Sequence, residues 1–112
     1  MHRKDVFAFR FLALSPASLE ALRKLCPAAI SRPVRKREGM VTGVFDLDAD
    51  HDYSWIKSFI DQHRIPECDY GLFVSVSTDS DSEIISLPKF AAEIFRAVGG
   101  GIDFSFTVLS EE

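Results

Sequence analysis

Cysteine is scarce in this sequence, and its hydrophobic runs are short. The two cysteines, Cys26 and Cys68, lie far apart and form no Cys-x-x-Cys pair. We expect two free thiols, packed as small apolar side chains in a reducing compartment, although a single bridge between them stays open.

No apolar run approaches the roughly 20 residues that cross a bilayer. The charged N-terminus, with Asp5 and Arg10 around a short apolar run, makes a poor signal peptide. We therefore expect a cytoplasmic protein with no membrane partner.

The residue patterns of common catalytic and nucleotide-binding sites are also missing. The sequence contains no His-x-x-x-His pair and no serine-centred nucleophile elbow, whereas nucleophilic catalysis needs a nucleophile oriented by a base and a metal ion needs three or four ligands. The glycines at 99–101 follow a helix pattern, while a phosphate-binding glycine loop follows a strand and opens a helix. We expect no enzyme, no cofactor and no metal ion.

The composition is that of a single folded domain covering residues 1–112. Of the 112 residues, 46% are apolar and 27% are charged, which is an ordinary balance for one domain of this length. Charge is unevenly placed: residues 1–38 hold nine Lys/Arg and three Asp/Glu, net +6, and residues 39–112 hold four and fourteen, net −10. This asymmetry either steers a charged partner or averages out because the two halves interleave in space.

Hydrophobic periodicity predicts an α/β (α+β) chain with the element order β-α-β-β-α-β-α-β. Strands and helices that alternate in so short a chain form a two-layer sandwich, with one mixed β-sheet and helices packed on one face. The predicted elements are a central strand at 6–14, a helix opened by Ser15-Pro16 and stopped by Pro27, a hairpin at 33–48, a helix at 53–62 capped by Asp52, a strand at 70–78, a helix at 88–98 and a final strand at 102–109. The predicted core residues are Phe7, Phe9, Phe11, Leu22, Phe59, Val74, Ile94, Phe104 and Phe106.

Two acidic segments and one basic segment stand out. The alternating aspartates at 46–52 suggest a calcium loop, but the EF-hand pattern needs Gly and Glu where this sequence has His51 and Lys57. A strand end followed by a helix cap is the simpler interpretation, because acidic side chains near a helix N-terminus stabilise the helix. The acidic run at 79–83 is typical of a solvated loop. If both runs lie at one end of the sheet, they form a single anionic surface.

The basic segment at 32–37 has the character of an edge strand. Charge and proline block further strand pairing, and a strand would divide these bases between its two faces. The sequence pI of about 5.3 and the lack of the aromatic pattern of RNA-recognition domains also count against nucleic-acid binding. We expect no nucleic-acid partner.

The second half of the sequence resembles a group of small bacterial proteins of unknown function. The segments that carry the resemblance are 72–81, 85–88, the helix that runs to Gly99, 102–106, the Arg37-Glu38-Gly39 turn and Trp55. Members of this group often lie beside polymorphic or contact-dependent toxins and are thought to act as immunity proteins. The resemblance implies a stoichiometric protein inhibitor with no chemistry of its own.

Sequence and resemblance together predict a non-catalytic immunity protein that neutralises a basic bacterial toxin domain, such as a nuclease. Acidic loops can imitate phosphates and speed the capture of a basic partner. The expected partner-binding residues are Asp48, Asp50, Tyr53, Asp79 and Asp81. The alternative is a small-ligand-binding or regulatory α/β domain that forms a homodimer through a sheet edge. Aromatic side chains inside an acidic rim favour the inhibitor, and a deep apolar pocket favours the ligand domain.

Overall fold

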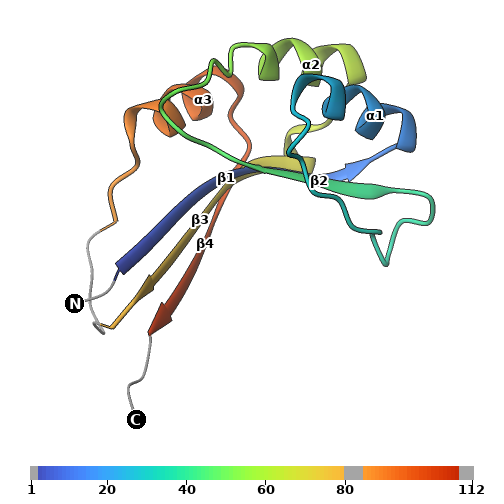
Figure 1. Ribbon diagram of the computed structural model, residues 1–112. Helices are drawn as coiled ribbons and strands as arrows, with labels where there is room; N and C mark the ends of the chain where they lie inside the picture. Colours follow the sequence, from blue (N-terminus) through green and yellow to red (C-terminus); the bar gives the residue numbers. More distant parts are fainter. Residues whose placement is uncertain (1–2, 80–84, 109–112) are drawn as a thin grey trace.

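The computed structural model describes residues 3–79 and 85–108. Within them the chain forms a four-stranded mixed sheet with three helices on one of its faces (Figure 1). This is the predicted two-layer α+β sandwich. In chain order the elements are β1 (Arg3–Leu14), α1 (Pro16–Leu25), β2 (Val41–Asp46), α2 (Trp55–His63), the short 3-10 helix η1 (Glu67–Asp69), β3 (Tyr70–Thr78), α3 (Lys89–Val98) and β4 (Gly101–Val108).

The strand order in the sheet is β2-β1-β3-β4, so β1 is internal, as predicted. β1 is antiparallel to both neighbours, and Phe9 is level with Phe45 of β2 and Leu72 of β3. β4 is parallel to β3, and parallel neighbours need a crossover connection, which α3 supplies. β2 and β4 therefore form the two edges of the sheet.

The hydrophobic core lies between the helices and the sheet face that carries Phe9 and Phe11. The ring centroid of Phe11 is 5.2 Å from that of Phe59 on α2 and 6.5 Å from that of Tyr70 on β3. Phe7 is half-buried and packs edge-on against Phe90, with centroids 6.4 Å apart. The predicted core residues that are confirmed as buried are Phe9, Phe11, Leu22, Phe59, Val74 and Ile94.

The predicted burial of Phe104 and Phe106 is wrong, because they are 57% and 42% exposed. Their register with Val74 and Val76 of β3 puts both rings on the same side of the sheet as the core. β4 is an edge strand, however, and it runs out beyond the helical layer (Figure 1). Alternation along a strand predicts which face a side chain occupies, but not whether anything covers that face.

The predicted first strand of the hairpin, at residues 33–37, is also wrong. Pro33 makes only an isolated bridge to Val41 of β2, and Ile30, just before the segment, makes another to Val44. The described element order therefore has one strand fewer than predicted. Proline has no N–H to donate to a ladder. The chain then turns, and Arg37 reaches the buried carboxylate of Asp69 at 2.8 Å. The segment still lies along the outer edge of β2.

Candidate binding groove and acidic loop

The last residue of β2 and the first part of the loop that leads to α2, residues 46–52, carry four aspartates and are called the acidic loop below. Leu47 is buried and its N–H donates to the carbonyl oxygen of Phe7 at 2.7 Å, which fixes the start of the loop on β1. The Tyr53 ring stacks on Phe45 with centroids 6.3 Å apart, which fixes its end. Between these anchors, the side chains of Asp48 and Asp50 are exposed.

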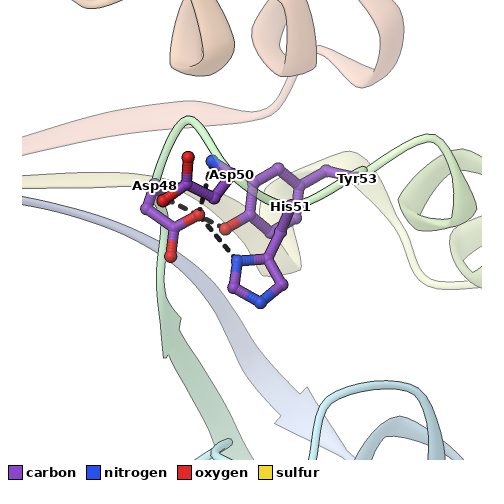
Figure 2. A network of polar contacts seen from close by, with 4 residues as sticks. All are labelled: Asp48, Asp50, His51 and Tyr53. Carbon is purple, nitrogen blue, oxygen red and sulfur yellow. Dashed lines mark hydrogen bonds and ion pairs between the residues drawn. The ribbon is translucent and has the colours of Figure 1, made fainter.

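Hydrogen bonds within the acidic loop converge on Asp48, as Figure 2 shows. Its Oδ1 accepts the N–H of Asp50 at 2.9 Å and lies 2.7 Å from Nδ1 of His51. The N–H of Asp48 donates to the hydroxyl oxygen of Tyr53 at 2.9 Å. Three of the five predicted binding residues, Asp48, Asp50 and Tyr53, are therefore brought together by one network.

Hydrogen bonds within the acidic loop favour the ionised forms of Asp48 and Asp52. The hydrogen bond with His51 lowers the pKa of Asp48, and the same contact with Asp48 raises the pKa of His51. Bonds from the N–H and hydroxyl of Ser54 lower the pKa of Asp52. Asp52 was predicted to cap a helix beginning at Tyr53. Instead its carboxylate accepts hydrogen bonds from the N–H and the hydroxyl of Ser54, and α2 begins at Trp55.

A groove of about 340 Å³ lies beside the acidic loop. Its apolar wall comes from the end of α1, the following segment and β2, and the half-buried rings of Tyr53 and Trp55 also line it. Its charged lining is acidic: Asp46, Asp48 and Asp52 contribute, with His51, and the described lining has no lysine or arginine. The site thus combines aromatic surface with a negatively charged rim.

Two further acidic residues, which sequence reasoning missed, lie around the acidic loop. Asp5 of β1 lines a hollow with Asp46 and Asp48, and Glu93 of α3 lines another with Asp52. Asp5 stands among bases in the sequence, and only the pairing of β1 with β2 brings it to the acidic loop. Glu93 carries an exposed i,i+4 pair with Lys89, a pattern that signals a solvated helix rather than a site.

The second predicted acidic segment does not join the first among the described residues. Asp79 is half-buried and directly follows β3, and Asp81 lies outside the described residues. Thr78 of β3 is level with residue 3 of β1, whereas Asp46 is level with Ala8. This offset of five residues corresponds to about 17 Å along the strand. The acidic surface is therefore centred on the acidic loop.

Ion pairs join the basic first third of the chain to the acidic remainder. Arg10 pairs with Asp103 of β4 and lies over the Phe73 ring, 4.6 Å from its centroid. Arg37 pairs with Asp69, and this hydrogen bond raises the pKa of Arg37. The two halves of the sequence interleave at these points, which removes part of the asymmetry of charge.

Both cysteines are free thiols, as predicted, but they differ in burial. Cys26 is half-buried beside the groove, and burial raises the pKa of its thiol. Cys68 is exposed, so its predicted packing as an apolar side chain is wrong: η1 places it on the surface beside the buried Asp69.

One polar contact between helices had no signal in the sequence. The hydroxyl of Ser18 on α1 lies 2.8 Å from Nδ1 of His63 on α2. The imidazole ring packs on Phe59 with centroids 4.3 Å apart, and the Ser15 hydroxyl is hydrogen-bonded to the Ser18 hydroxyl. The contact links the N-terminus of α1 to the C-terminus of α2.

In the described part of the chain, no cluster of three or more His, Cys, Asp or Glu side chains is arranged to hold a metal ion. The helices described at 16–25, 55–63 and 89–98 include none long and apolar enough to cross a membrane. No protein-family model, curated protein or solved structure matches the chain. Function is therefore inferred from the surface chemistry of the chain itself.

Proposed function

We propose that this protein is a non-catalytic immunity protein that binds a basic bacterial toxin domain at the groove beside the acidic loop. The observation that carries the proposal is the pairing of aromatic surface, Tyr53 and Trp55, with the acidic rim of Asp46, Asp48 and Asp52. Interface anchors are most often aromatic side chains with polar surroundings. This pairing supports the proposal of a protein-binding surface.

The chemistry of the groove suits a lysine or arginine side chain of the partner. The aliphatic stem of such a side chain packs on apolar surface while its charged end remains at the rim. A cation over the face of Tyr53 or Trp55 is attracted by the ring, and the carboxylates accept charge-assisted hydrogen bonds. The surrounding acids, Asp5 and Glu93 included, accelerate the encounter.

The test compares two double variants that remove the same charge. Asp48→Asn with Asp50→Asn changes the acidic loop, and the amide oxygen of asparagine at 48 still accepts the N–H of residue 50. Glu20→Gln with Asp61→Asn is the matched control, because both residues are exposed and outside the groove. We expect the first variant to associate about tenfold more slowly with the toxin domain encoded by the neighbouring gene, with a weaker salt dependence.

Stopped-flow kinetics at low and high salt measure this effect, and thermal unfolding verifies that both variants are folded. Exposed loop charges contribute little to stability, so both should unfold near the wild-type temperature. Equal association rates for the two double variants would show that the acidic loop is not the docking surface.

Binding should also strengthen as pH rises through the raised pKa of His51. Protonated His51 forms an ion pair with Asp48 and sits among Asp48, Asp50 and the Tyr53 ring. The ion pair stabilises the loop at low pH and is lost as His51 deprotonates, which frees Asp48 for a cationic partner. We expect the affinity to rise as the pH increases above about 6.5, the ordinary pKa of histidine, and His51→Gln to flatten that rise. Calorimetric titration across this range measures it, and an unchanged profile in the variant would contradict the role of His51.

A small cationic ligand is the second candidate occupant of the groove. The observation in its favour is the groove volume of about 340 Å³, which lies within the range of small-molecule sites. The ligand would share the aromatic and acidic surfaces described above. A thermal-shift screen of organic cations tests this reading, and stabilisation that Asp48→Asn abolishes would support it over the toxin.

A further inference from the structure

No strand among the described residues pairs with the outer edge of β4, whereas the outer edge of β2 is covered. Residues 30–34 run along β2 and form bridges at Val44 and Val41. β4 is the other edge of the sheet, and its described residues pair only with β3. Natural edge strands are usually protected by lysine, proline, a bulge or a covering segment. β4, with the sequence GIDFSFTV, has no lysine, arginine or proline.

The side chains of β4 are unusually apolar for an exposed strand. Phe104, Phe106 and Val108 share one face and are 57%, 42% and 49% exposed. The charged residue of the strand, Asp103, lies on the other face and is paired with Arg10 of the same chain. The edge therefore offers unpaired backbone groups and apolar rings with its charge already compensated.

We infer that β4 pairs antiparallel with β4 of a second copy of this chain, across a two-fold axis at Ser105. Residues directly opposite one another in an antiparallel pair share a face. An axis at Ser105 puts Phe104 opposite Phe106 of the second copy, and Ile102 opposite Val108. Aromatic and β-branched cross-strand pairs of this kind stabilise a sheet.

Charge disfavours one competing register. An axis at Asp103 would oppose two aspartates, which is unfavourable. With the axis at Ser105, Asp103 faces the neutral Thr107 of the second copy, and the paired stretch extends over the whole of 102–108. The strand is thus self-complementary, as a two-fold interface requires.

A second copy fits β4 better than a basic toxin does. The acids that attract a basic partner lie around the acidic loop, at the β2 side of the sheet, and β4 has no free negative charge to add. Because residues 30–34 cover β2, pairing at β4 closes at two chains and does not continue into a filament. The dimer leaves both acidic grooves open, so the inference is independent of the proposed function.

Two lysine substitutions on the same face of β4 test both the dimer and its register. Ser105→Lys puts like charges across the axis and should raise the dimer dissociation constant at least about tenfold. Thr107→Lys, the matched control, faces Asp103 of the second copy and should leave the dimer intact or tighten it. Analytical ultracentrifugation over a concentration series, from micromolar to millimolar, measures the oligomeric state of each full-length protein. Circular dichroism verifies folding.

A crosslink supplies a second test that does not depend on charge. In a Cys26→Ser, Cys68→Ser background, Ser105→Cys should form a disulfide-linked dimer under mild oxidation, because residues on the axis lie opposite one another. The same background with Ser75→Cys, on the neighbouring strand β3, should remain uncrosslinked. A wild-type protein that is monomeric at millimolar concentration would overturn the inference. A dimer that both lysine variants weaken equally, or neither weakens, would also overturn it.

Discussion

Replacing Phe11 with alanine is expected to destabilise the protein by about 3–5 kcal/mol. Phe11 is fully buried, and its ring contacts those of Phe9, Phe59 and Tyr70 at centroid distances of 5.1, 5.2 and 6.5 Å. Truncation removes this apolar surface from the core and leaves a cavity, because strand β1 and helix α2 cannot both collapse onto the space.

Phe104→Ala is the matched control, since it removes the same side chain from an exposed position. With 57% of Phe104 exposed, we expect the free energy of unfolding to fall by less than about 1 kcal/mol, measured at a concentration where the protein is monomeric. Urea or guanidinium unfolding measures both variants. A loss at Phe104 as large as that at Phe11 would mean that β4 is covered in the monomer.

Gly71→Ala is expected to destabilise the protein by about 1–3 kcal/mol or more. A Cβ at this position would lie 2.3 Å from the carbonyl oxygen of Gly101 and 2.8 Å from its carbonyl carbon. These are backbone atoms of the neighbouring strand, and Gly71 is level with Gly101 in the β3–β4 pairing. A side chain here therefore forces the two strands apart where β4 begins.

Gly101→Ala is the control on the opposite strand. A Cβ at Gly101 meets no atom within 4 Å and its φ is not positive, so we expect a neutral effect or a small stabilisation from the reduced freedom of the unfolded chain. Thermal and denaturant unfolding measure both. If the Gly71→Ala protein were as stable as the Gly101→Ala protein, movement of β4 would have to relieve the close approach of the two strands.

Several local features could be predicted from the sequence because their causes are local. Ser15 and Pro16 start α1 as expected, with the Ser15 hydroxyl accepting the N–H of Ser18 at 3.2 Å. The strand predicted at 70–78 matches β3, and its alternation predicted the buried face. Residues two apart on a strand share a face, and residues near a helix start satisfy its free N–H groups, whatever the rest of the chain does.

The candidate site was predictable only in part. Asp48, Asp50 and Tyr53 are close in sequence, and one loop keeps them together. Asp5 and Glu93 reach the same surface from β1 and α3, and no sequence pattern connects them to it. Asp79 shares the acidic composition but lies about five residues away in strand register.

The sequence by itself determined the class of fold, the internal place of β1 and the face on which each strand residue lies, because periodicity and capping act over a few residues. The tertiary structure alone decided what is covered. Phe104 alternates as regularly as Phe9, yet Phe9 is buried in the core with residues of the helices and Phe104 is exposed. Pro33 and Arg37, predicted as strand, became an edge cover tied to Asp69. Burial depends on where whole elements pack against one another, and that is a long-range outcome which no local pattern contains.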